Sequence, residues 1–147
     1  MSHHKVDKST LIEGLNEDLA HEYAAIIMYN TYAAAVTGVH RNELKKFFLA
    51  EVQDELRHAQ FLADKITALG GKAITRAAEV PYTTSVHEML ENVLKSETET
   101  VTRYVKRMKQ AEEFGDYGLA SELDDMIADE TRHKEESEKI LRGNWSD

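Results

Sequence analysis

The hydrophobic positions of this chain repeat at a fixed distance of 75 residues. The longest uninterrupted apolar run, residues 24–29, is far shorter than the roughly 20 residues that a membrane-spanning helix needs. We therefore expect two similar halves in a soluble protein. Three pairs of leucines share the 75-residue separation: Leu15 and Leu90, Leu19 and Leu94, and Leu44 and Leu119.

Glycine and proline divide the chain into four predicted helices. Proline occurs once, at Pro81, and glycine is sparse, so the chain permits long helices. We expect the first helix to begin at a capping box, T-x-x-E, from Thr10 to Glu13, and the third at S-x-x-E, from Ser85 to Glu88. Glycine marks the end of each helix. The predicted helices cover residues 10–38, 42–69, 85–114 and 117–142.

The connections between these helices indicate how they pack. The first and last connections are short, which makes the first two helices and the last two helices antiparallel hairpins. The middle connection, "GGKAITRAAEVPYTT", has 15 residues. It could reach about 50 Å when extended, whereas the second helix is about 42 Å long. We therefore predict an all-α fold with one domain over residues 1–147: an antiparallel four-helix bundle with a long crossover between the second and third helices.

Composition restricts the partners of such a bundle. The formal net charge of −9 argues against non-specific binding to nucleic acid, which requires clustered Lys and Arg. The absence of cysteine excludes disulfides and thiolate metal sites. The N-terminal segment is polar and has no apolar stretch of the signal-peptide type. We expect a cytoplasmic protein with neither nucleic-acid nor membrane partners.

Glutamate and histidine follow the same 75-residue repeat as the leucines. The pattern D-E-x-R-H occurs at residues 54–58 and again at residues 129–133. A single E-x-x-H is a weak signal in a chain rich in Glu, because it arises readily by chance. Two copies at the repeat distance are more specific, since other residues repeat with them. These are Glu22 with Glu97 and Tyr29 with Tyr104.

The predicted hairpins bring the repeated glutamates to one height in the bundle. Residues equidistant from a hairpin turn lie side by side. Glu22 and Glu55 satisfy this condition, and Glu97 and Glu130 satisfy it to within two residues. In each E-x-x-H, the Glu and the His are three residues apart and share a helix face. If these side chains point inward, four carboxylates and two imidazoles converge in the interior.

Such a cluster requires compensating charge. Buried carboxylates without partners raise one another's pKa and are costly. Two divalent cations would offset four carboxylates. Mixed oxygen and nitrogen ligands suit first-row metals such as Fe or Mn, whereas Mg and Ca do not favour imidazole and a single Zn site needs fewer ligands. The spacing therefore predicts a centre for two Fe or Mn ions.

Over residues 10–142 the chain resembles the ferritin-like superfamily of di-iron carboxylate proteins. These four-helix bundles provide one Glu from each of two helices and an E-x-x-H from each of the other two. The ligand pattern is most similar to that of bacterioferritin and of mini-ferritin-like proteins with the site inside one subunit. The resemblance implies two Fe ions per chain, with Mn as the alternative metal. The implied ligands are Glu22, Glu55, His58, Glu97, Glu130 and His133.

The resemblance also implies roles for these ligands and their neighbours. Glu55 and Glu130 are expected to bridge the two metals, and each remaining ligand is expected to bind one metal. Bacterioferritin-like proteins carry an Asp before each bridging Glu. This implies that Asp54 and Asp129 hydrogen-bond a ligand histidine across the pseudo-twofold axis. Tyr29 matches a tyrosine near the iron centre, where it would be redox-active or form a hydrogen bond.

Four further residues near the predicted centre are expected to lie outside it. Tyr104 is expected to pack in the core. Glu51, one turn before Glu55, is expected to be exposed, although it could guide metal ions inward. Arg57 and Arg132 are expected to point outward or to pair with acidic neighbours.

The resemblance implies a ferroxidase, an oxidoreductase in which O2 or H2O2 oxidises two bound Fe(II) ions and Fe(III) passes to storage. The alternative is a rubrerythrin- or manganese-catalase-like enzyme that consumes peroxide with a fixed di-metal cofactor and stores no iron. Rubrerythrin has an additional Glu on the third helix, where this chain has Leu94 and Thr100, and it usually has cysteine-ligated iron. A third alternative is a non-enzymatic interaction bundle, which predicts no metal.

The chain departs from its implied relatives in two respects. Bacterioferritin binds haem through a Met at the position of Leu56, so haem binding of that kind is not expected. The 24-subunit cages have a fifth helix that this sequence does not provide for, which argues against that assembly. The stretch "AAIIMYNTYAAAV" in the first helix is apolar on most sides. It predicts a subunit contact, and hence a homo-oligomer that is at least a dimer.

Overall fold

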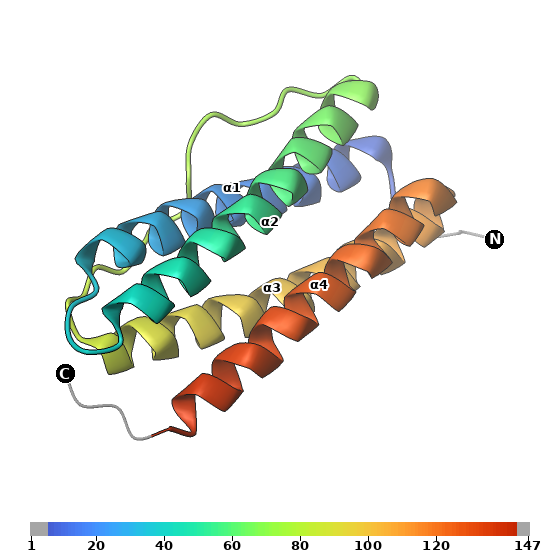
Figure 1. Ribbon diagram of the computed structural model, residues 1–147. Coiled ribbons are helices and arrows are strands. Elements are labelled where there is room, and N and C mark those ends of the chain that lie inside the picture. The colour runs from blue at the N-terminus through green and yellow to red at the C-terminus, as the bar shows by residue number, and fades with distance from the viewer. Residues whose placement is uncertain (1–5, 144–147) are drawn as a thin grey trace.

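The computed structural model describes residues 6–143, which form four α-helices. No β-strand occurs in this part of the chain. The prediction of an all-α, antiparallel four-helix bundle is confirmed. Figure 1 shows two long hairpins packed against each other. The helices are α1 (Lys8–Ala35), α2 (Arg41–Ala68), α3 (Val86–Phe114) and α4 (Tyr117–Leu141).

The start of α1 differs from the prediction. The side chain of Asp7 caps this helix by accepting a hydrogen bond from the Thr10 backbone N–H at 2.7 Å. Thr10 therefore lies inside the first turn, and the predicted capping box at this residue is wrong. At α3 the predicted cap is present, because the Ser85 side chain accepts from the Glu88 backbone N–H at 3.3 Å.

The end of α1 lies three residues before the predicted Gly38. Val36 adopts an extended conformation and is fully buried, so the helix ends at Ala35. The Arg41 guanidinium, at the start of α2, donates to the carbonyl oxygens of Ala33, Ala34 and Val36. These carbonyls are ones that the helix end leaves without partners. An arginine from the next helix thus caps the C-terminal end of α1. Beyond it the chain turns at Gly38, whose φ is 100°.

The segment between α2 and α3 runs along α1. Near the beginning of α1, the Asn16 side chain accepts from the Ile74 backbone N–H and donates to the Lys72 carbonyl. Near its end, the Tyr32 hydroxyl donates to the Pro81 carbonyl at 2.7 Å. The segment therefore follows α1 from its first turns to its last, and α3 starts close to the end of α1 (Figure 1).

The apolar core is divided into two clusters, one toward each end of the bundle. Leu15 and Leu62 belong to one cluster, and Tyr32 and Phe48 belong to the other; all four are fully buried. On every helix, buried polar residues lie between the segments that contribute to the two clusters. The fold therefore surrounds a polar middle layer with apolar packing on both sides.

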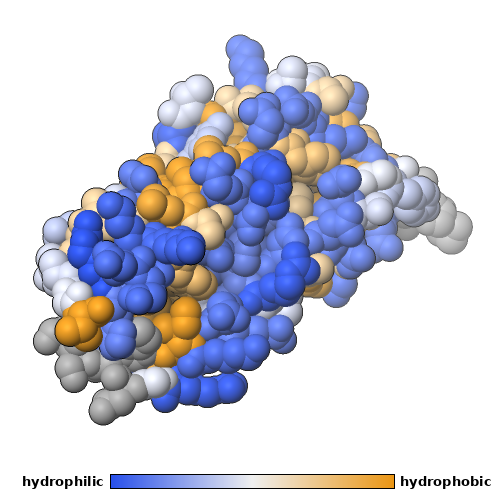
Figure 2. Space-filling view, in the orientation of Figure 1, coloured by the Kyte–Doolittle hydropathy of each residue, from blue (hydrophilic) through white to orange (hydrophobic). Residues whose placement is uncertain are grey.

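The surface is mainly hydrophilic, as Figure 2 shows for one face. Three large apolar residues on α1 and α2 are nevertheless well exposed: Ile27 at 46%, Leu49 at 40% and Leu56 at 46%. Within residues 6–143, no helix is both long enough and apolar enough to cross a bilayer.

Candidate metal centre

All six predicted ligands lie together in the middle layer of the bundle. Each helix supplies one glutamate, and α2 and α4 each add a histidine. All six side chains are buried, and His133 is the most accessible, at 7% exposure. The residues that meet there are Glu22 from α1, Glu55 and His58 from α2, Glu97 from α3, and Glu130 and His133 from α4.

The two glutamates of the E-x-x-H motifs lie between the two imidazole rings. Glu55 places Oε2 3.9 Å from the Nδ1 of His58 and Oε1 3.4 Å from the Nδ1 of His133. Glu130 places Oε1 3.2 Å from the Nδ1 of His58 and Oε2 3.8 Å from the Nδ1 of His133. Each of these carboxylates therefore offers one oxygen to each ring, which is the arrangement that a bridging ligand requires.

Aspartates from the opposite hairpin hold the outer nitrogens of both rings. The Nε2 of His58 lies 3.1 Å from the Asp129 carboxylate, and the Nε2 of His133 lies 2.8 Å from that of Asp54. The predicted contact across the pseudo-twofold axis is confirmed. Because a carboxylate accepts the Nε2–H, the Nδ1 lone pair of a neutral ring faces the centre.

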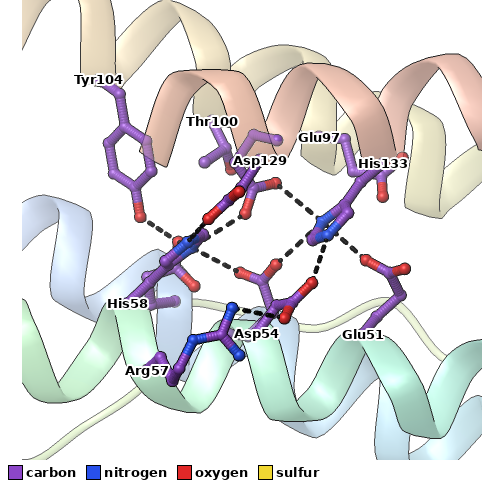
Figure 3. Close-up of polar contacts among 12 residues, drawn as sticks. Glu51, Asp54, Arg57, His58, Glu97, Thr100, Tyr104, Asp129 and His133 are labelled. Carbon is purple, nitrogen blue, oxygen red and sulfur yellow. Dashed lines mark hydrogen bonds and ion pairs between the residues drawn. The ribbon is translucent and has the colours of Figure 1, made fainter. Parts of the chain in front are cut away.

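Exposed arginines hold these aspartates in turn, as the sequence predicted. Arg57 donates to Asp54 at 2.6 Å, and Arg132 donates to Asp129. The contacts of Arg57 and Asp54 are drawn in Figure 3. Each hydrogen-bonded set thus runs from a surface arginine through an aspartate to a buried histidine.

Two tyrosines hold the remaining glutamates. The Tyr29 hydroxyl donates to Oε2 of Glu97 at 2.6 Å, and the Tyr104 hydroxyl donates to Oε1 of Glu22. Tyr29 therefore forms a hydrogen bond beside the centre, one of the two roles expected for it. Tyr104 packs in the core as expected, but its hydroxyl also reaches the centre, which the sequence did not predict. The 75-residue repeat already paired Tyr104 with Tyr29, and that signal could have identified it.

The prediction that Glu51 is exposed is also wrong. Only 8% of the residue is accessible, and its Oε2 lies 2.6 Å from the Nδ1 of His133. Figure 3 shows Glu51 reaching from α2 toward the His133 ring. Glu51 lies four residues before Glu55 and so shares its helix face.

The sequence did not predict that Ser137 contacts the centre. Its hydroxyl donates to Oε1 of Glu97 at 2.8 Å, so both oxygens of that carboxylate accept a hydrogen bond. Ser137 lies four residues after His133, and this spacing was the only sequence signal for its position. Serine is too common on helices for that spacing to stand out.

Many polar atoms of the centre are buried without a hydrogen-bond partner. Such atoms are rare in folded proteins, and each requires an explanation. Carboxylate oxygens together with imidazole nitrogens are the donor set of first-row metal ions. The residues therefore fit the predicted group of two metals. The atoms are Oε2 of Glu22, Oε2 of Glu51, Oε1 of Glu55, Nδ1 of His58, Oε1 of Glu130 and Nδ1 of His133.

The pKa values of the residues in the centre reflect the cost of burying these charges. Burial and the neighbouring Glu22 and Glu130 raise the pKa of Glu55 well above its usual value. Burial by itself lowers the pKa of both imidazoles, but the surrounding carboxylates raise that of His58 to about 10 and that of His133 to about 11. In the metal-free protein, protons thus partly neutralise the carboxylates in place of cations.

Comparison with known proteins places this geometry in context. A family model described as a ferritin-like domain matches residues 12–143. A bacterioferritin of Streptomyces coelicolor is 32% identical over 124 residues, which cover 84% of this chain and 74% of that protein.

Solved structures are also similar. One, described as ferritin-like, diiron-carboxylate proteins from Bacillus anthracis str. Ames, is 52% identical, with a TM-score of 0.90, over 96% of this chain and 99% of that one. Another, a bacterioferritin-related protein of Bacteroides fragilis described as a dodecameric thioferritin, is 25% identical, with a TM-score of 0.85, over 94% of this chain and 88% of that one.

Proposed function

The chain belongs to the ferritin family of ferritin-like domains, within the di-iron carboxylate superfamily, and on this premise we propose that it is a di-iron ferroxidase. It would oxidise Fe(II) with O2 or H2O2 and serve iron storage or detoxification. One observation carries this proposal: Glu55 and Glu130 each direct one oxygen toward each histidine.

The residues of the centre would divide the work of holding two ions. Glu55 and Glu130 would bridge the pair. The imidazoles of His58 and His133 would each bind one ion through Nδ1, since Asp129 and Asp54 occupy the other nitrogens. The four carboxylates of the predicted ligand set would offset the four positive charges of two divalent ions. Manganese would fit the same donors, and iron is our choice because of the family.

The terminal carboxylates are oriented by the protein itself. Tyr104 holds one oxygen of Glu22, and Tyr29 holds one oxygen of Glu97. These contacts fix the carboxylates before a metal arrives and so reduce the cost of ordering them. Burial of the whole cluster keeps bulk water away. When bound, the two iron ions supply the redox chemistry, because two Fe(II) ions together can give two electrons to O2 or H2O2.

We also propose that the chain forms a homo-oligomer through the outer face of α1 and α2. Ile27, Leu49 and Leu56 are exposed there. A groove on this face is lined by Tyr23, Ile26 and Leu56. Leu56 also lacks the thioether by which bacterioferritin binds haem, so this contact would form without a haem of that kind.

The test of function is an iron titration of the metal-free protein. Fe(II) is added without oxygen, air or H2O2 is admitted, and the Fe(III) that stays soluble is counted per chain. Uptake well beyond two per chain supports ferroxidase activity with storage. Saturation at two replaces storage with a fixed cofactor and favours peroxide consumption. Absence of oxidation, or equal oxidation by Glu55→Gln, contradicts the di-iron proposal.

A further inference from the structure

The two ends of the metal centre are not equivalent, although the ligands repeat every 75 residues. At the His58 end, Oε1 of Glu22 lies 3.7 Å from the Nδ1 of the ring. The repeat would place Glu97 in the same way at the His133 end. There, Glu51 approaches the ring most closely instead, at 2.6 Å.

Glu97 is held by hydrogen bonds that its counterpart lacks. Both of its oxygens accept, one from Tyr29 and one from Ser137. Glu22 accepts only from Tyr104 and retains one oxygen without a partner. The repeat counterpart of Ser137 is Leu62, which cannot donate a hydrogen bond. Glu97, the glutamate of the His133 end, is therefore held by one more hydrogen bond than Glu22.

Glu51 lies where the repeat would place Glu97, next to the Nδ1 of His133. Its repeat counterpart on α4 is Met126, so the His58 end has no equivalent carboxylate. The side chain of Glu51 is 10% exposed and that of His133 is 8% exposed. The Oε2 of Glu51 and the Nδ1 of His133 face each other, and neither has a hydrogen-bond partner. When a metal displaces the proton from the His133 ring, these two atoms present lone pairs to one point, which is what a cation binding there requires.

Asp54 also lies close to His133, but it has a different role. It contacts the Nε2 of the ring, on the side away from Glu51. A neutral imidazole that donates Nε2–H to Asp54 leaves only Nδ1 to bind a metal. Glu51 and His133, with Glu55 and Glu130, therefore make up the donor set at this end.

We propose that Glu51 is a further metal ligand, which binds a divalent cation together with His133 at that end of the centre. This inference rests on the proposed di-metal function and deepens it. Glu51 and His133 are more exposed than the other predicted ligands, at 8% and 7%. An incoming cation therefore meets this pair first. Glu97, which Tyr29 and Ser137 hold, would join afterwards through its remaining lone pairs.

The experiment uses Co(II), whose visible absorption reports its ligands and which does not require oxygen-free handling. His58→Ala and His133→Ala each disable one end of the centre. Glu51→Gln, which keeps the shape of the side chain but removes its charge, is introduced into each variant and into the unmodified chain. Glu43→Gln, at an exposed position on the same helix, is the matched control. Circular dichroism and thermal unfolding verify that each variant is folded.

The unmodified chain should bind two Co(II) ions. Glu51→Gln should weaken one of them at least about tenfold, because even outer contacts to a metal ligand contribute that much. Adding Glu51→Gln to the His58→Ala variant should cause the same loss of affinity and change the Co(II) spectrum. Adding Glu51→Gln to the His133→Ala variant should cause neither effect. Equal losses in both backgrounds, or no loss in either, overturn the role of Glu51 while the two-metal function stands. Absence of Co(II) binding by the unmodified chain overturns both.

Discussion

Hydrogen bonds from tyrosines orient two carboxylates of the centre. The two tyrosines should differ in how much they contribute to stability. Glu97 has a second donor in Ser137, whereas Glu22 has only Tyr104. Tyr104→Phe would leave a buried carboxylate without any of its hydrogen bonds. Tyr29→Phe would leave one in place.

We therefore expect Tyr104→Phe to lower the free energy of unfolding of the metal-free protein by about 1–3 kcal/mol. Tyr29→Phe should lower it by less. Chemical denaturation of both variants measures the difference, and each variant serves as the control for the other. Equal losses would mean that Ser137 does not support Glu97.

Protonation of the histidines should make metal affinity depend on pH. The neighbouring carboxylates outweigh burial and raise the pKa of His58 to about 10 and that of His133 to about 11. For Glu97, burial raises the pKa to about 8. Between pH 6 and 8 the metal-free imidazoles are therefore protonated, and a metal must displace those protons.

Because binding releases protons, affinity should rise as the pH rises. Each displaced proton should add about tenfold for each pH unit. Calorimetric titration with Co(II) in two buffers of different ionisation enthalpy counts the protons released. Affinity that stays constant from pH 6 to 8 would show that the metal-free histidines are already neutral.

At the scale of helices, one buried ion pair joins α1 to α3. Arg107 donates to Asp18 through Nε at 2.8 Å, and both residues are almost inaccessible. The guanidinium packs directly against Gly14, where an added Cβ would overlap it. The Arg107 side chain is held by Asp18 and by Gln110 at 2.6 Å, so it cannot move aside without losing hydrogen bonds.

Gly14→Ala should consequently destabilise the protein by about 1–3 kcal/mol, despite the higher helix propensity of alanine. Gly118→Ala on α4 is the matched control, because the nearest atom to an added Cβ there is 3.7 Å away. It should be neutral or stabilising by up to about 1 kcal/mol. Thermal or chemical unfolding compares the two variants. Stabilisation by Gly14→Ala would mean that the Arg107 pair rearranges freely.

Local sequence signals were reliable for the helices when the signal was contained within a few residues. Ser85 caps α3 as its motif predicted. The start of α1 was ambiguous because Asp7 and Thr10 are both good capping residues, and only the structure selects Asp7. The end of α1 depends on Arg41 from the next helix, a contact that no local pattern contains.

At the scale of the whole molecule, the internal repeat made the centre predictable. The repeat and the hairpin turns together place the six polar residues at one height of the bundle. The repeat could not reveal the features in which the halves differ. Glu51 and Ser137 have no polar counterparts in the other half, at Met126 and Leu62, so symmetry gave no reason to select them. The unsymmetrical part of the centre therefore required the structure.

The exposed apolar residues on α1 and α2 make the proposed assembly testable. Ile27 and Leu56 expose apolar surface on neighbouring helices, and such patches mark contacts between proteins. Ile27→Glu would place a charge in the proposed contact. Val39→Glu, at a residue that is 91% exposed in the turn between α1 and α2, is the control.

We expect light scattering to show an oligomer for the unmodified chain and for Val39→Glu, and a much smaller species for Ile27→Glu. All predicted metal ligands come from the four helices of one chain, so Ile27→Glu should still bind two Co(II) ions. Storage of iron beyond two per chain should be lost, since an isolated bundle encloses no space for a mineral. An unchanged mass for Ile27→Glu would show that the subunit contact lies on another face.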